Sequence, residues 1–181
     1  MIYIPTGSEL LDSNKIIARL DLKAGMKVAD LGCGAKGHFV WPSAKAVGED
    51  GVVYAVDILK SALDSIASQS KLQNFNSITP VWSDIEVYGG AKDIIDGSCD
   101  AAVLVNVHSK PAMIKEALRV LKKDGKLLLV DWKAVATPFG PPTKDRVSAE
   151  EAKKRAAGFN LTLEQEFDAG PHHWGLIYKK I

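Results

Sequence analysis

Apolar residues along this chain alternate between short β-branched runs and longer segments with helical spacing. Five short apolar runs are typical of buried strands, and they cover residues 27–31, 52–56, 77–82, 101–105 and 126–131. Helical spacing predicts helices over 8–20, 38–47, 60–72 and 111–121, whereas 85–97 is mixed and predicts a short helix and a loop. Because strand–helix alternation requires crossovers between parallel strands, the pattern predicts an α/β fold with helices on both faces of a parallel sheet.

The last part of the chain departs from this alternation. After a proline-rich loop at 136–143, Ser148-Ala149-Glu150-Glu151 forms a capping box, which predicts a helix that ends at Ala157. Two further strands are predicted over 160–167 and 174–179. Since a short turn joins them, we expect an antiparallel pair.

Composition and charge are those of an ordinary globular domain. The 181 residues are 46% hydrophobic and 25% charged, with a net charge of +1, which argues against a protein that binds nucleic acid or anionic membranes by bulk electrostatics. We expect one domain over 1–181, with 1–22 as an N-terminal helix, capped by Ser8, that can serve as a lid. Residues 1–5 are too short and uncharged for a signal peptide, no apolar run reaches transmembrane length, and two cysteines without metal-type spacing fit the cytoplasm.

The segment Val28–Gly37 (VADLGCGAKG) predicts a strand, a glycine-rich turn and the start of a helix. Glycine lacks a Cβ, so such a turn brings backbone amides close to a ligand, and the helix start favours an anion. Gly32, Gly34 and Gly37, with Asp57 about twenty residues further on, match the dinucleotide fingerprint. Two cofactor classes use a turn of this kind: dinucleotides and S-adenosyl-L-methionine (SAM).

Three features favour SAM over a dinucleotide. Asp30, two residues before Gly32, would repel a pyrophosphate but suits the ammonium group of a methionine moiety. Asp84 follows the third predicted strand, where it can accept a hydrogen bond from an adenine amino group. The chain also ends in an antiparallel pair rather than in a further βαβ half.

With these features the chain resembles the class I SAM-dependent methyltransferases over nearly its whole length. The segments that carry the resemblance are Val28–Gly37, Val53–Asp57, Trp82–Ile85, Asp100–Val107, Glu116–Leu127, Ala157–Phe159 and Trp174–Tyr178. The resemblance implies a Rossmann-like, doubly wound, seven-stranded and mostly parallel sheet with one antiparallel strand. The nearest branch is the small-molecule type that includes quinone-biosynthesis C-methyltransferases. Lys36 departs from the pattern, because the family usually has glycine at that position.

The resemblance also implies the cofactor site, in which Asp57 holds both ribose hydroxyls and Asp84 contacts adenine. The expected SAM-binding residues are Asp30, Gly32, Cys33, Gly34, Gly37, Asp57, Ile58, Asp84, Ile85 and Asn106. No catalytic base is identified; His108 is a candidate, with an ordinary loop residue as the alternative. No metal site is expected, because the adjacent His172 and His173 would face opposite ways on a strand. Acceptor-pocket candidates are Tyr3, Trp132, Lys133 and Phe139, for each of which ordinary packing is equally compatible.

The sequence therefore predicts a SAM-dependent methyltransferase that acts on a small molecule, without membrane insertion and with its oligomeric state open. An RNA 2′-O-methyltransferase of the fibrillarin-like type is the alternative, favoured by 51–56 and Lys133 but opposed by Asn106 in place of an acid. A non-catalytic SAM-binding protein also remains open. An NAD-dependent oxidoreductase ranks last, because no catalytic Tyr-x-x-x-Lys group lies at the strand ends.

Overall fold

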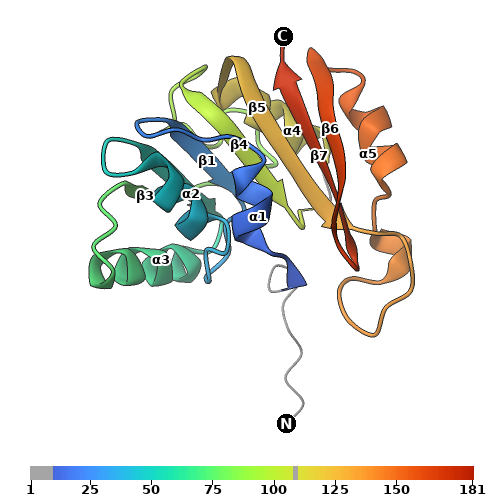
Figure 1. Ribbon diagram of the computed structural model, residues 1–181, viewed down its shortest axis with the longest axis horizontal. Coiled ribbons are helices and arrows are strands. Elements are labelled where there is room, and N and C mark those ends of the chain that lie inside the picture. The colour runs from blue at the N-terminus through green and yellow to red at the C-terminus, as the bar shows by residue number, and fades with distance from the viewer. Residues whose placement is uncertain (1–9, 108–109) are drawn as a thin grey trace.

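The computed structural model describes residues 10–107 and 110–181 and forms a seven-stranded sheet between two layers of helices (Figure 1). The strands are β1 (Lys27–Leu31), β2 (Val52–Asp57), β3 (Ile78–Trp82), β4 (Cys99–Val105), β5 (Leu121–Trp132), β6 (Leu161–Gly170) and β7 (His173–Lys180). The helices are α1 (Ser13–Ala18), α2 (Val40–Val47), α3 (Lys60–Leu72), α4 (Pro111–Val120) and α5 (Ala149–Ala156), with a 3₁₀ turn, η2, at Thr143–Asp145.

The sheet order is β3-β2-β1-β4-β5-β7-β6. Strands β1 to β5 pair in parallel, whereas β7 is antiparallel to both β5 and β6. The predicted doubly wound, mostly parallel sheet with one antiparallel strand is therefore confirmed. Because β7 runs against β5, its first residues lie at the same edge as the carboxyl ends of the parallel strands, where sheets of this type bind their ligands.

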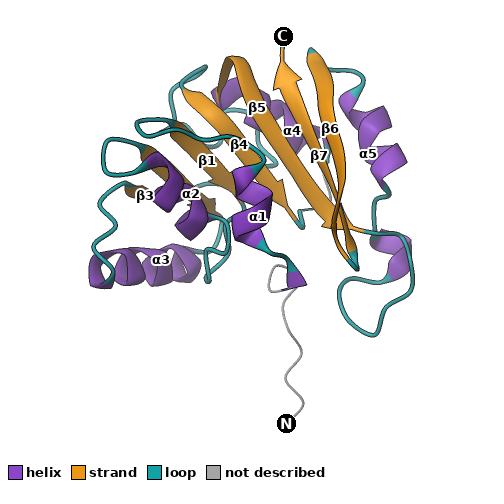
Figure 2. Cartoon of the chain, in the orientation of Figure 1, coloured by secondary structure: helices purple, strands orange, loops and turns teal. Residues whose placement is uncertain are grey.

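Alternating side chains of the strands build two apolar layers, one on each face of the sheet. Figure 2 shows the helices that cover the two faces. On β4, for example, Val103 packs with α1, α2 and Ile66 of α3, whereas Leu104 packs with α4 and α5. Both side chains are fully buried. Burial of each such side chain contributes about 1.5–3 kcal/mol, so the helices are held mainly by their apolar faces.

Most predicted elements agree with the structure to within three residues at each end, and two starts differ by five residues. The first helix begins at Ser13 rather than at Ser8, because Asp12 caps it by accepting a hydrogen bond from the Lys15 amide at 3.1 Å. Ser8 itself lies outside the described residues. The fifth strand begins at Leu121, five residues early, and its register with β4 shifts near that start. The capping box is confirmed, since Ser148 Oγ accepts from the Glu151 amide at 3.2 Å.

The helix predicted within 85–97 is wrong, because this segment forms a series of turns. Two side chains of α4 hold these turns. The fully buried Glu116 accepts from the amides of Gly89 and Ala91 at 2.7 and 3.0 Å. Arg119 pairs with Glu116 at 2.8 Å and donates to the carbonyls of Ala91 and Ile94. Burial raises the pKa of Glu116, but its hydrogen bonds outweigh this effect and hold the pKa below the ordinary value.

Candidate functional site

The glycine-rich turn after β1 is closed by its own hydrogen bonds. The amides of Gly32 and Cys33 both donate to the carbonyl of Val56, at 2.8 and 2.9 Å, and the Gly34 amide donates to Asp57 Oδ2 at 2.9 Å. These three amides therefore already have partners at the end of β2. A pyrophosphate requires such amides as donors, so this geometry argues against a dinucleotide.

Two of the glycines are required by both backbone conformation and space. Gly32 has φ +91°, and a Cβ there would lie 2.8 Å from Val107 Cγ1. Gly37 has φ +57°, and its Cβ would lie 2.5 Å from Ile66 Cδ1. Gly34 has φ +64° but open space around it, so its conformation alone favours glycine. The turn thus lets the strand end, the helix start and the β4 loop approach one another closely.

Asp30, at the end of β1, is buried and carries an unsatisfied acceptor. Its side chain is 3% exposed, and Oδ2 has no hydrogen-bond partner among the described residues. Burial, together with the negative charge of Asp57, raises the pKa of Asp30 to about 7. A cation at this position would satisfy the orphaned oxygen and offset the repulsion, which is the chemistry expected for an ammonium group.

Asp57 lies at the end of β2 and links two neighbouring loops. Its Oδ1 accepts from the Leu59 amide at 2.9 Å, while Oδ2 accepts from Gly34. The side chain is half-buried. A carboxylate offers about four acceptor positions, so it can still accept hydrogen bonds from a diol placed over the strand ends.

A pocket of about 250 Å³ lies over the carboxyl ends of β1, β2 and β3 and reaches the first residues after β4. Five residues expected from the sequence line it: Gly32, Asp57, Ile58, Asp84 and Ile85. Four further lining residues are not among the SAM-binding residues expected from the sequence: Ser83, Glu86, Val107 and Met113. The structure thus brings together residues from four separate segments into one concave, partly apolar site.

Ser83 is the most informative of the residues that the sequence analysis missed. It is 6% exposed, and its Oγ has no hydrogen-bond partner among the described residues. A purine ring in the pocket would supply that partner. Its position beside Asp84 was the available signal, but a single serine after a strand is too common to be specific. Met113, within the helix predicted over 111–121, both packs in the core and lines the pocket.

Asp84 also forms a local turn of its own. The side chain is exposed, and Oδ1 accepts from the Glu86 amide at 2.9 Å. This contact fixes the carboxylate at the rim of the pocket. Its proposed role toward adenine stays a prediction.

The remaining expected residues lie beside the pocket rather than on its lining. Burial raises the pKa of the Cys33 thiol well above its usual range, which keeps the thiol protonated. Asn106 adopts φ +57°, and its amide donates to Val130 O at 2.9 Å, which turns the chain at the end of β4. Lys36 stands where the resembling family usually has glycine. Its carbonyl accepts a hydrogen bond from Trp41 Nε1 at 2.7 Å, which fixes the backbone at this position. His108 and Tyr3 lie outside the described residues.

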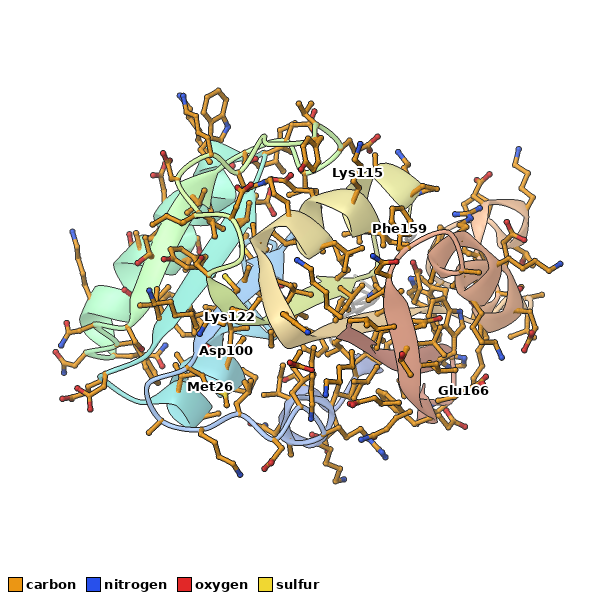
Figure 3. All side chains as sticks on the ribbon, turned by 90° about the horizontal axis from the view of Figure 1, so that it is seen from above. Met26, Asp100, Lys115, Lys122, Phe159 and Glu166 are labelled. Atoms are coloured by element: carbon orange, nitrogen blue, oxygen red, sulfur yellow. The ribbon has the colours of Figure 1, made fainter. Side chains whose placement is uncertain are left out.

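Two larger hollows lie away from these strand ends, and Figure 3 labels residues of both. One, of about 320 Å³, is lined by Met26, Asp100 and Lys122, and the charges of the last two pair at 2.8 Å. The other, of about 630 Å³, is lined by Lys115 and Phe159 beside α4. Neither contains the glycine turn or the acids that follow β1 and β2.

Residues 10–107 and 110–181 hold neither a metal-binding cluster nor a membrane-spanning helix. No group of three or more His, Cys, Asp or Glu side chains in these ranges could hold a metal ion. No helix formed by these residues is long and apolar enough to cross a bilayer.

Known proteins are similar to this chain in sequence and in fold. The profile of a family described as a methyltransferase domain matches residues 22–173. A nocamycin O-methyltransferase of Saccharothrix syringae is 25% identical over 78% of this chain and 49% of its own length. A ubiquinone/menaquinone biosynthesis C-methyltransferase of Chromobacterium violaceum is 34% identical over 66% of this chain and 48% of its own length. The chain thus spans about half the length of these two curated relatives.

Solved structures show the same fold. A SAM-dependent methyltransferase from Aquifex aeolicus superimposes with a TM-score of 0.85 at 22% identity, covering 98% of this chain and 94% of that one. A geranyl diphosphate C-methyltransferase from Streptomyces coelicolor, crystallised with S-adenosyl-L-homocysteine, gives a TM-score of 0.74 at 12% identity, covering 93% and 75%.

Proposed function

Since this chain belongs to the family described as a methyltransferase domain, we propose that it transfers a methyl group from SAM to a small-molecule acceptor. The observation that carries the proposal is the orphaned carboxylate of Asp30 beside a second acid, Asp57, at the edge of the sheet where ligands bind. Two neighbouring carboxylates favour a ligand that brings a cation and hydroxyl donors. They disfavour a phosphate-bearing cofactor.

The residues at the strand ends fit the ammonium, ribose and adenine groups of SAM one after another. Asp30 would hold the ammonium group, Asp57 the ribose hydroxyls, and the pocket lined by Ser83, Asp84 and Ile85 the adenine. The expected contacts of Gly32, Cys33, Gly34, Gly37, Ile58 and Asn106 belong to the same proposal. When bound, SAM supplies an electrophilic methyl group whose transfer leaves a neutral thioether.

The chain's own contribution is positioning. Methyl transfer is an in-line displacement, and holding the two reactants at contact distance accounts for most of the assistance it needs. Asp57 keeps the turn after β1 fixed through Gly34, so the cofactor site is formed before the ligand binds. The proposal also includes a cytoplasmic location, which the free thiols of Cys33 and Cys99 support.

Calorimetric titration with SAM and with S-adenosyl-L-homocysteine tests the cofactor half of the proposal. We expect saturable binding of both, and no displacement of either by NAD. Heat released by NAD but not by SAM would contradict the proposal. The acceptor half is tested by incubating the protein with methyl-labelled SAM and a fractionated small-molecule extract, in which label should move to an organic product.

A further inference from the structure

The antiparallel β7 brings one histidine to the ligand edge of the sheet. His173 pairs with Trp132 at the end of β5, while Val130 of β5 pairs with Val105 of β4. The cofactor pocket covers the ends of β3, β2 and β1 and reaches Val107 after β4. In the sheet order the next strands are β5 and β7, so these two strands lie on the side of β4 that faces away from the cofactor pocket.

His173 also lies on the same face of the sheet as Asp30. Side chains two residues apart on a strand point to one face. Asp30 shares the face of Val28, and His173 shares the face of Ile177, and both of these apolar residues belong to the layer under α1 and α2. Neighbouring strands are about 4.8 Å apart, which puts the strand of His173 about 10 Å from β4.

The imidazole of His173 is buried without any hydrogen-bond partner among the described residues. Its side chain is 0% exposed, and both ring nitrogens are unsatisfied within this part of the chain. Leaving a buried polar group unsatisfied costs about 1–3 kcal/mol, so such a group requires an explanation. A ligand that hydrogen-bonds to the ring would provide one.

The surroundings of His173 are aromatic and cationic. The Trp132 ring lies 4.2 Å from the imidazole, and the guanidinium of Arg146 lies 4.9 Å above the Trp132 ring. Burial, followed by the positive charges of His172, Arg146 and Lys133, lowers the pKa of His173 to about 4. The ring is therefore neutral near pH 7, with one nitrogen that donates and one that accepts. Aromatic walls favour a flat molecule, and the nearby cations favour an oxygen that carries partial negative charge.

We propose that His173 is an acceptor-binding residue and that it hydrogen-bonds to the hydroxyl group of a flat aromatic acceptor. This inference rests on the proposed function for the identity of the reaction. Arg146 holds the loop of residues 133–146 over Trp132 through hydrogen bonds to its carbonyls, including those of Val135 and Phe139. Entry of the acceptor therefore requires the Trp132 indole to move away from the imidazole.

Binding of hydroxyarenes to the full chain tests this role. The probes are phenol and 2-naphthol, each compared with the arene that lacks the hydroxyl, in the presence and in the absence of S-adenosyl-L-homocysteine. Nitrogen-15 spectra of the histidine rings report hydrogen bonding directly, and the His173→Phe variant assigns the His173 signals. His173→Phe keeps an aromatic ring against Trp132 and His173→Asn keeps one polar group. Glu164→Gln, at an exposed position on β6, is the control.

We expect 2-naphthol to shift the His173 ring signals and naphthalene to leave them unchanged. His173→Phe should weaken 2-naphthol binding at least tenfold, His173→Asn less, and Glu164→Gln not at all, with S-adenosyl-L-homocysteine binding unaltered in all three. The inference is overturned if neither hydroxyarene shifts these signals, or if the His173→Phe variant, shown to be folded by circular dichroism, binds 2-naphthol as the parent does. Loss of S-adenosyl-L-homocysteine binding by the parent protein would instead count against the proposed function, while the hydroxyarene measurements without that ligand still decide the role of His173.

Discussion

The backbone amide of Gly34 donates to the carboxylate of Asp57 at 2.9 Å, which joins the turn after β1 to the end of β2. The same carboxylate accepts from the Leu59 amide. One side chain therefore fixes both loops that border the proposed ribose position. Asp57 therefore stabilises the glycine-rich turn and is also a candidate SAM-binding residue.

Replacing Asp57 by asparagine should weaken SAM binding by about 10- to 150-fold, because hydrogen bonds to a charged acceptor contribute about 1.5–3 kcal/mol. Calorimetric titration measures the change. Asp64→Asn, at an exposed position on α3, is the control and should bind SAM as the parent does. Equal affinity of the two variants would exclude Asp57 from the cofactor site.

The raised pKa of Asp30 predicts an unusual dependence of the free energy of unfolding on pH. Its folded pKa of about 7 exceeds the ordinary value of 3.8, so the unfolded chain loses the proton first as pH rises. Below pH 3.8 the group has no effect, and from there to pH 7 it destabilises the ligand-free fold progressively, by about 4 kcal/mol in total.

Asp30→Asn removes this penalty. Relative to the parent, the variant should therefore gain stability between about pH 4 and pH 8 in urea denaturation, while its affinity for SAM falls at least tenfold. Identical pH profiles for the two proteins would show that Asp30 is not the titrating group. Retained affinity would remove it from the proposed ammonium site.

Glu116 should be essential for stability although it lies outside the pocket. Glu116→Gln removes the buried carboxylate that pairs with Arg119 and leaves only the exposed Asp96 as its charged partner, and breaking a buried pair costs about 3–5 kcal/mol. Chemical denaturation measures the loss, and hydrogen exchange of the Gly89 and Ala91 amides should accelerate. Glu151→Gln, which removes a surface pair with Arg155, should cost less than about 1 kcal/mol.

Gly37 and Gly34 form a matched pair for separating steric from conformational strain. Both have positive φ, but only Gly37 is crowded, because a methyl group added there would lie 2.5 Å from Ile66 Cδ1. Gly34→Ala should cost about 1 kcal/mol from backbone conformation alone, and Gly37→Ala about 1–3 kcal/mol more from overpacking. Thermal unfolding compares them; equal costs would mean that α3 shifts freely to admit the methyl group.

Much of the architecture could be predicted, because the strands that build the sheet centre are short, apolar and bounded by turn signals. The segment Lys27–Leu31 has the predicted boundaries, since both faces of β1 are buried and its turn is marked by glycines. The start of α1, in contrast, could not be predicted from the local sequence. Ser8 and Asp12 are both good N-caps, and local sequence does not reveal which of them the chain uses.

The helix predicted within 85–97 was wrong for a different reason. Its turns are held by Glu116 and Arg119, which lie about 25 residues further along the chain. No local pattern within the segment reports these partners, so a propensity argument misses them. The same limit applies to the site: the acids after β1 and β2 could be found, but neither the orphaned Ser83 hydroxyl nor the aromatic surroundings of His173 could be, since tertiary packing creates both.

Because β7 runs against its neighbours, the connection between β6 and β7 lies at the ligand edge of the sheet, but apart from the strand ends that form the proposed cofactor site. The short connection at Pro171 and His172 opens onto the rim of the sheet, next to β5 and remote from the tips of β2 and β3. Extra residues inserted in this hairpin would extend over the rim without altering the glycine turn. Under the proposed function, such an insertion would change the acceptor side of the site and leave the residues proposed for the methyl donor in place.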